Sequence, residues 1–170
     1  MGMYPGGNII RITPTISGTA YGAGDVLFLT TEIPNAVSSR GGVSKLLSVT
    51  MIHQHDAADD IALVFMKNSY NLIGALSPGS SGGPAISDAD VEAAEMTGII
   101  HIDSSDNRQD LGGSGIYTTG GNQNSVALQA PQLLQAAEGS RSVYVAGIAY
   151  DTQDYGAADD LDLVFHIEYL

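Results

Sequence analysis

A nine-residue stretch occurs twice in this chain, once in each half, and it limits the folds open to the protein. Residues 57–65 are Ala-Ala-Asp-Asp-Ile-Ala-Leu-Val-Phe and residues 157–165 are Ala-Ala-Asp-Asp-Leu-Asp-Leu-Val-Phe, with seven identities in nine positions. Apolar residues at alternate positions place Leu63 and Phe65 on one face of a β-strand. The repeat therefore predicts two strands that each begin after an acidic turn. Acidic turns also precede strands in β-proteins that carry no repeat, which is the plainer interpretation.

Another strand-like run precedes each copy, at residues 46–53 and at residues 143–150. A strand, a polar turn and a second strand are typical of a β-hairpin. We therefore predict two similar hairpins, which end with strands at residues 61–67 and 161–170. We expect the hairpins to occupy related places, either as neighbours in one sheet or facing each other across a sandwich.

The rest of the chain predicts short strands between loops rich in glycine, which occurs 21 times in 170 residues. A helix is expected over residues 87–96, with Ser87 as its N-cap, Asp90 in a capping box and Gly98 at its end. Residues 130–138 fit either a second short helix, with Pro131 in its first turn, or a loop. Loops are expected at residues 68–84 and 103–115, and further strands at residues 8–15, 26–33, 98–102, 116–119 and 125–129.

These elements predict a mainly β fold: an antiparallel β-sandwich, of which the jelly roll is one form, with one or two short helices and a flexible N-terminal arm. The length fits one domain with one core. Residues 1–14 are expected to form the arm and the first strand, and residues 15–170 the β-sandwich domain. Residues 1–7 should be a loose arm, and they lack the basic flank and apolar core of a signal peptide.

Composition excludes several classes of partner and site. The net charge is −13, and Lys and Arg together number 6, so neither nucleic acid nor an anionic membrane surface is an expected partner. No apolar run approaches the roughly 20 residues that span a bilayer. The chain contains no cysteine, which excludes disulfides, thiolate metal sites and a cysteine nucleophile.

Residues 79–84, Gly-Ser-Ser-Gly-Gly-Pro, are similar to the signature around the nucleophile of trypsin-like serine proteases, which makes Ser81 a candidate nucleophile. Such an enzyme also needs a histidine base and an orienting aspartate. The upstream histidines His53 and His55 precede Ser81 by only 28 and 26 residues (81 − 53 and 81 − 55), too few for most of a first barrel. A Gly/Ser loop explains the string better, and we expect no catalytic residue.

The histidines and aspartates are candidate metal ligands. Two histidines one residue apart on a strand can face one ion, but spacing supplies no third ligand, so exposed side chains at a strand end are the simpler interpretation. An EF-hand loop needs aspartates at alternate positions, a central glycine and a closing glutamate, and neither acidic segment fits this pattern, so we expect solvated turns, without metal or cofactor. A carboxylate pair for glycoside hydrolysis is a spatial pair that spacing does not test, but the chain has no Trp and 3 Phe for a sugar platform. The residues weighed are His53, His55, His101, His166, Asp103, Asp106, Asp110, Asp151, Asp154, Asp159 and Asp160.

Several short segments carry a family resemblance through their order along the chain. They lie at residues 15–25, 33–37, 41–43, 47–50, 63–65, 86–90, 139–146 and 161–165. Together they resemble the small head proteins of tailed bacteriophages that are called decoration or cement proteins, from about residue 12 to the C-terminus. Residues 103–123 and 132–137 depart from the family pattern.

The resemblance implies a structural, non-enzymatic protein on the outer capsid surface of the virion, assembled in the host cytoplasm. Its partner would be the major capsid protein, and it would form homotrimers that lock neighbouring capsid subunits together. We also expect residues 1–14, because they bury little of themselves, to take part in anchoring or in exchange between subunits. The alternatives are a trypsin-like serine hydrolase that uses Ser81 and a carbohydrate-binding β-sandwich module.

Overall fold

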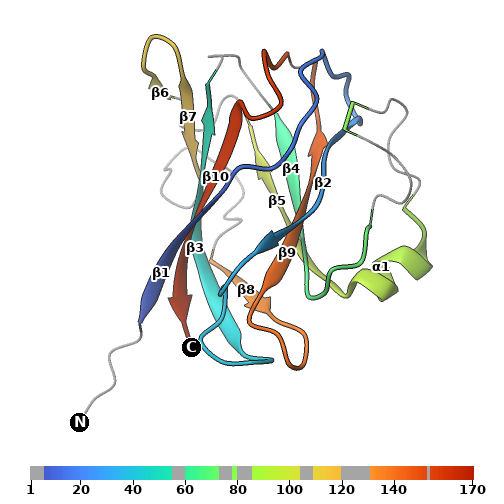
Figure 1. Ribbon diagram of the computed structural model, residues 1–170, viewed down its shortest axis with the longest axis vertical. Coiled ribbons are helices and arrows are strands. Elements are labelled where there is room, and N and C mark those ends of the chain that lie inside the picture. The colour runs from blue at the N-terminus through green and yellow to red at the C-terminus, as the bar shows by residue number, and fades with distance from the viewer. Residues whose placement is uncertain are drawn as a thin grey trace.

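Two antiparallel β-sheets pack face to face in the computed structural model, which describes residues 6–54, 60–72, 78–79, 86–103, 109–119, 131–152 and 154–170 (Figure 1). The predicted mainly β sandwich is therefore confirmed. The first sheet contains, in spatial order, β1 (Gly7–Ile12), β10 (Leu161–Tyr169), β3 (Val43–His53), β7 (Gly115–Thr118) and β6 (Gln109–Asp110), and β8 (Gln132–Gln135) also pairs with β3. The second sheet contains β2 (Val26–Ile33), β9 (Val143–Ala149), β4 (Ile61–Met66) and β5 (Met96–Ile102).

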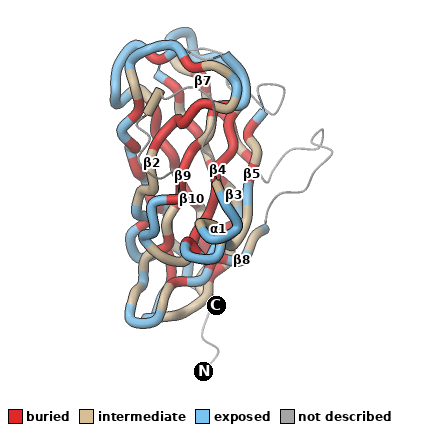
Figure 2. The backbone as a smooth tube through the Cα atoms, turned by 90° about the vertical axis from the view of Figure 1, so that its right-hand side faces the viewer, coloured by how far each residue is buried: buried red, intermediate tan, exposed pale blue. Residues whose placement is uncertain are grey.

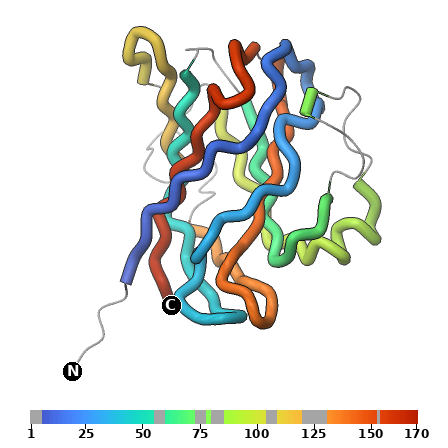
Figure 3. The backbone as a smooth tube through the Cα atoms, viewed as in Figure 1, coloured from blue at the N-terminus to red at the C-terminus, as the bar shows by residue number. Residues whose placement is uncertain are grey.

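The strand order is that of a jelly roll. Four antiparallel pairs nest from the ends of the chain inward: β1 with β10, β2 with β9, β3 with β7, and β4 with β5. Alternate pairs lie in alternate sheets, as when one long hairpin is wrapped around a core. As a result, β1 begins and β10 ends at the same end of the sandwich (Figure 3).

The two predicted hairpins are wrong in their pairing, although their strands are present. β3 lies in the first sheet and β4 in the second, and β9 and β10 are divided between the sheets in the same way. Each repeat unit is therefore an arch from one sheet to the other. Alternating polarity and a polar turn are common to hairpins and arches, so the sequence pattern did not distinguish them.

The prediction that the two units occupy related places is confirmed by their pairing with each other. β3 pairs with β10 and β4 pairs with β9, so that Leu161 lies opposite His53 and Ile61 lies opposite Ala149. Both ladders then continue for five residue pairs without a register shift. Phe65 and Phe165, which are equivalent in the two copies, meet edge to face with their ring centroids 6.0 Å apart. The two repeat units therefore contact each other through equivalent residues, as they would if an approximate two-fold axis related them.

The acidic turns close the same reciprocal arrangement with backbone hydrogen bonds. The N–H of Gln54, directly after β3, donates to the carbonyl of Asp160 at 2.9 Å. The N–H of Tyr150, directly after β9, donates to the carbonyl of Asp60 at 2.7 Å. The end of β3 is thus hydrogen-bonded to the residue before β10, and the end of β9 to the residue before β4.

The core lies between the sheets and contains large aromatic side chains. Figure 2 shows buried positions along the strands and exposed positions mainly in the loops. Burial of an aliphatic or aromatic side chain of this size contributes about 1.5–3 kcal/mol. The largest fully buried side chains are Tyr21, Tyr117, Tyr155, Phe28, Phe65 and Phe165.

A second apolar cluster covers the outer face of the second sheet. The helix α1 (Asp88–Ala94) contributes Ala94 to it, and the strands contribute Val64 and Met66 of β4. Because of this cover, β4 is buried at all six positions. Among the described residues, α1 is the only helix. It packs on the outer face of the second sheet, so the two outer faces of the sandwich differ.

The helix begins as predicted and ends earlier. Ser87 is its N-cap, and the Asp90 carboxylate accepts from the Ser87 N–H at 2.9 Å in the predicted capping box. Glu95, at φ 49°, ends the helix, and the prediction that Gly98 ends it is wrong. Gly98 lies in β5. A Cβ at this position would lie 2.1 Å from Nε2 of Gln132, so the Gln132 side chain occupies the space that a larger residue would need. No described helix is long and apolar enough to cross a membrane.

Residues 132–135 form a strand, which contradicts both the short helix and the loop that were the two expectations for residues 130–138. Leu133 is exposed and Leu134 is buried, so the side chains alternate with the period of a strand. β3 supplies the pairing partner, with Leu133 opposite Lys45. A short strand, β6, also occupies part of the loop expected at residues 103–115, and the strand expected at residues 125–129 lies outside the described residues.

Candidate interaction surface

The outer face of the first sheet carries an open groove of about 530 Å³. Its side walls include Ile9 of β1, which is 66% exposed, and Leu47 of β3, which is 44% exposed. Large apolar side chains that face solvent on both sides of one groove indicate a surface suited to a partner. The groove is lined by Gly7, Asn8, Ile9, Leu47, His166 and Ile167.

A register shift between β10 and β3 produces one wall of this groove. Ile167 pairs with Leu46 and His166 pairs with Ser48, so Leu47 is an extra residue in β3. A β-bulge of this kind changes the direction of a side chain. Leu46 and Val49 remain fully buried on either side, and Leu47 faces outward. The exposure of Leu47 is thus imposed by the backbone.

Leu133 extends the apolar surface on the far side of β3, and we call Ile9, Leu47 and Leu133 the apolar strip. Leu133 is 59% exposed and lies opposite Lys45, two positions before Leu47 on β3. Lys45 forms an ion pair with Glu168, with Nζ and Oε2 3.0 Å apart, so the charges beside the strip are balanced. The strip is therefore an electrically neutral surface in a chain of net charge −13.

Many of the described acidic side chains lie at the other end of the sandwich. They belong to the loops that join strand ends there, at the far end from the start of β1 (Figure 1). The acidic residues of those loops are Asp60, Asp103, Asp151, Asp154, Asp159 and Asp160, and Asp110 lies in β6.

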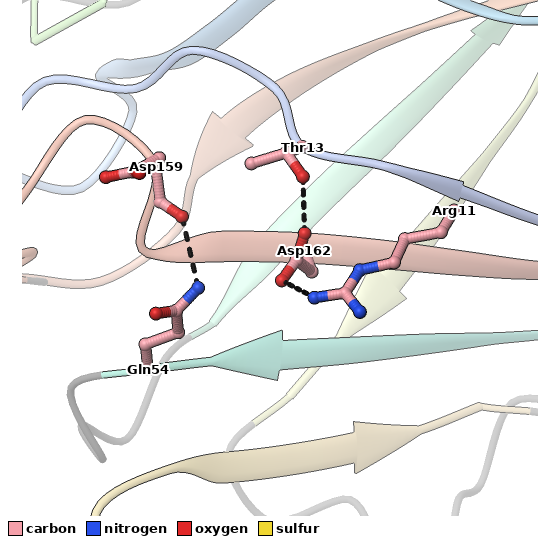
Figure 4. A network of polar contacts seen from close by, with 5 residues as sticks. All are labelled: Arg11, Thr13, Gln54, Asp159 and Asp162. Carbon is pink, nitrogen blue, oxygen red and sulfur yellow. Dashed lines mark hydrogen bonds and ion pairs between the residues drawn. The ribbon is translucent and has the colours of Figure 1, made fainter.

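A polar network fixes β1 to β10 above the groove (Figure 4). The Asp162 carboxylate, 2% exposed, accepts from the Arg11 guanidinium and from the Thr13 hydroxyl. Burial raises the pKa of Asp162, but the hydrogen bonds from Arg11, Thr13 and Gln54 and the charge of Arg11 outweigh it, so that the pKa lies below its ordinary value. Gln54 also donates to the carbonyl of Asp159 at 3.3 Å.

This network bears on the expected role of residues 1–14. Ile10 and Ile12 of β1 are buried in the main core, so the expectation that this segment buries little of itself is wrong for β1. The alternating side chains of the strand explain the difference, because Ile9 and Arg11 face outward while their neighbours face the core. Residues 1–5 lie outside the described residues.

The candidate nucleophile of the protease-like segment lies outside the described residues. Ser81, with the rest of residues 80–85, and His55 lie outside the described residues. His53, the other candidate base, is fully buried, and its ring lies 4.4 Å from the ring of Tyr155. The prediction that His53 is an exposed residue at a strand end is therefore wrong, because β3 directs this side chain into the core.

A small polar pocket of about 100 Å³ lies at the acidic end of the sandwich. The ring of His101 packs edge to face against Tyr150 with the centroids 4.7 Å apart, and Tyr150 is 55% exposed. The carboxylates of Asp60 and Asp103 share the lining with Ile61 and Ile102. Residues 60, 101, 103 and 150 have no spacing that links them in the sequence, so no pattern could have found this pocket.

The described histidines lie on three strands: His53 on β3, His101 on β5 and His166 on β10. Within the described ranges, no group of three His, Asp or Glu side chains could hold a metal ion.

Several candidate aspartates bind the backbone of their own turns. Asp110 accepts from the N–H of Gly112 at 2.6 Å, and Asp160 accepts from the N–H of Ala157 at 2.7 Å. Asp151 accepts from the N–H of Thr152, and Asp154 and Asp159 are exposed. These contacts agree with the interpretation as solvated turns. Asp106 lies outside the described residues.

Comparisons with known proteins leave the family of the chain open. A scan against protein-family models found no match, and a search of curated proteins found no relative. The groove and the apolar strip are therefore the features from which a function is argued.

Proposed function

We propose that the protein is a structural component of a phage particle that binds the outer surface of the capsid and cements neighbouring major-capsid subunits as a homotrimer. The observation that carries this proposal is the outer face of the first sheet, where Ile9, Leu47 and Leu133 face solvent beside an open groove. Exposed apolar side chains gathered on one face are typical of surfaces that bind a partner. The short segments whose order along the chain resembles that of decoration proteins support the major capsid protein as that partner.

The rest of the molecule supports a role in binding. A jelly roll with a continuous apolar core supplies a stiff frame, and the network around Asp162 fixes the edge strand that carries Ile9. A rigid face loses little conformational entropy on binding, which favours a protein that stays attached to a shell.

Co-sedimentation with empty capsids tests the proposal. The probe is an empty shell assembled from the major capsid protein of the phage that encodes this chain, without any decoration protein. We expect the chain to sediment with the shell at saturable stoichiometry and to raise the temperature at which the shell breaks. Leu47→Asp should weaken this binding, whereas Leu111→Asp, a change at a more exposed leucine far from the strip, should not. A chain that stays in the supernatant at every concentration would contradict the proposal.

The polar pocket at the acidic end favours a second candidate, a carbohydrate-binding module. Tyr150 offers a half-exposed aromatic ring beside the carboxylates of Asp60 and Asp103, a combination that can bind the apolar face and the hydroxyls of a sugar. A glycan array tests this function. Binding that is lost in Tyr150→Ala and kept in Tyr70→Ala, another exposed tyrosine, would support it, and an array without signal would reject it.

A further inference from the structure

We propose that the free edge of β1 binds an extended segment of a partner protein, which adds to the first sheet as a further strand. The segment has apolar or uncharged side chains at alternate positions and carries no net negative charge. This inference goes beyond the proposed function, since it concerns the backbone edge of the sheet and not its outer face, and it does not depend on a capsid.

The register of β1 determines which of its backbone groups face away from the sheet. The N–H of Tyr169 donates to the carbonyl of Gly6 at 2.8 Å, so these two residues, which lie opposite each other, form a hydrogen-bonded pair. Hydrogen-bonded and non-hydrogen-bonded pairs alternate along an antiparallel ladder. The N–H and C=O groups of Gly7, Ile9 and Arg11 therefore point away from β10. Among the described residues, no strand pairs with this side of β1.

The other long edge strands are protected against an added strand in ways that β1 is not. β2 has register shifts against β9, and the N–H of Gly79 donates to its Val26 carbonyl at 2.9 Å. β5 has a register shift against β4, and the Gln132 side chain lies against its Gly98. Bulges and covering groups of this kind prevent pairing at sheet edges. β1 pairs over six residues without a shift and contains neither proline nor lysine.

Charge narrows the chemistry of the segment. Arg11 is the one charged residue of β1, and its guanidinium is ion-paired with the buried carboxylate of Asp162 on β10. An added strand therefore meets a neutralised edge. The whole chain has a net charge of −13, which repels an acidic segment and equally a second copy of this chain.

A pocket of about 320 Å³ lies where the free edge ends. The residues directly after β1 continue its alternation, because Thr13 and Thr15 are exposed and Pro14 is buried. A strand that follows the edge therefore reaches the pocket, which has no charged residue in its lining and suits an uncharged side chain. In strand addition, backbone hydrogen bonds supply affinity and pockets for alternate side chains supply specificity. The pocket is lined by Thr13, Pro14, Thr15, Leu29, Thr31 and Pro78.

A display library of random linear peptides tests the inference with probes that contain no capsid protein. We expect enriched peptides with apolar residues at alternate positions and no net negative charge. Ile9→Pro should raise the dissociation constant of the strongest peptide at least about 10-fold over that of Ile9→Ala, since both variants lose the isoleucine but only proline removes the outward N–H. Proline is tolerated at an edge position whose N–H faces solvent, and circular dichroism establishes that both variants are folded.

N-methylation of the strongest peptide tests the geometry without any change to the protein. In an added strand, alternate N–H groups face β1 and the others face solvent. We expect methylation of every second residue to abolish binding and methylation of the residues between them to preserve it. In the protein, the amide protons of Ile9 and Arg11 should exchange rapidly when the chain is free and slowly when the peptide is bound, whereas that of Ile10 should exchange slowly in both states.

Four results would each overturn the inference. They are a library without binders, peptides that bind Ile9→Pro as tightly as Ile9→Ala, N-methylation effects without a two-residue period, and self-association of the chain that Ile9→Pro abolishes, which would assign the edge to a second copy. Capsid binding is a separate outcome. A chain that binds peptides at β1 and ignores capsids would support this inference and reject the proposed function.

Discussion

Replacing Gly147 with alanine should destabilise the sandwich, because the ring of Phe28 occupies the space where the new methyl group would lie. The two residues face each other across β2 and β9. A Cβ on Gly147 would lie 2.2 Å from Cε1, 2.5 Å from Cδ1 and 2.9 Å from Cζ of that ring. Carbon atoms in normal contact are about 3.5–4.0 Å apart, so the ring would have to move by more than 1 Å.

The surroundings of Phe28 decide the magnitude. The side chain is fully buried, so it cannot turn into solvent. Forcing an extra methyl group into a packed core costs about 1–3 kcal/mol. Alanine also restricts the unfolded chain, which returns about 0.4–1 kcal/mol, so we expect a net loss of about 1–2 kcal/mol. In a domain of this length, each kcal/mol lowers the Tm by roughly 2–4 °C.

Urea and thermal unfolding followed by circular dichroism measure this loss. Gly113→Ala is the matched control, because a Cβ at Gly113 would meet no atom within 4 Å. Adding Phe28→Leu to Gly147→Ala should recover part of the loss, since a smaller side chain makes room for the methyl group. If Gly147→Ala is as stable as Gly113→Ala, the packing of the Phe28 ring against Gly147 is wrong.

Three further predictions concern other parts of the fold. Because the folded-state pKa of Asp162 is lowered, its contribution to stability should be present above the ordinary pKa of an aspartate and lost as the pH falls through the folded value; thermal unfolding of Asp162→Asn against pH should lack this component. Phe65→Leu and Phe165→Leu should be non-additive by about 0.5–1.5 kcal/mol in a double-mutant cycle, whereas additive losses would contradict their contact. Ser87→Ala should cost about 1 kcal/mol and speed hydrogen exchange in α1, and unchanged exchange would reject the cap.

Local features were predictable because local chemistry decides them. The strand at residues 26–33 has the bounds that were predicted, since it opens with a run of apolar residues and Pro34 follows its last residue. Ser87 and Asp90 form the predicted capping box, because both partners lie within one turn of each other. In the repeat units, the strands after the acidic turns begin at Ile61 and Leu161, as expected.

Features that depend on partners distant in sequence were not predictable. The polar turns after β3 and β9 fit a hairpin or an arch equally well, and the choice is made by which strands are available to pair. Leu133 and Leu134 form a strand because β3 offers a free edge beside them. The exposure of Leu47 depends on a register shift against β10, for which the sequence of β3 carries no signal.

A cryo-electron microscopy reconstruction of empty capsids saturated with this chain tests the central claim most directly. The proposed function predicts density for a jelly roll on the outer surface at three-fold or quasi-three-fold positions, bridging neighbouring capsid subunits. A bare outer surface at saturating concentration would contradict the capsid-binding function.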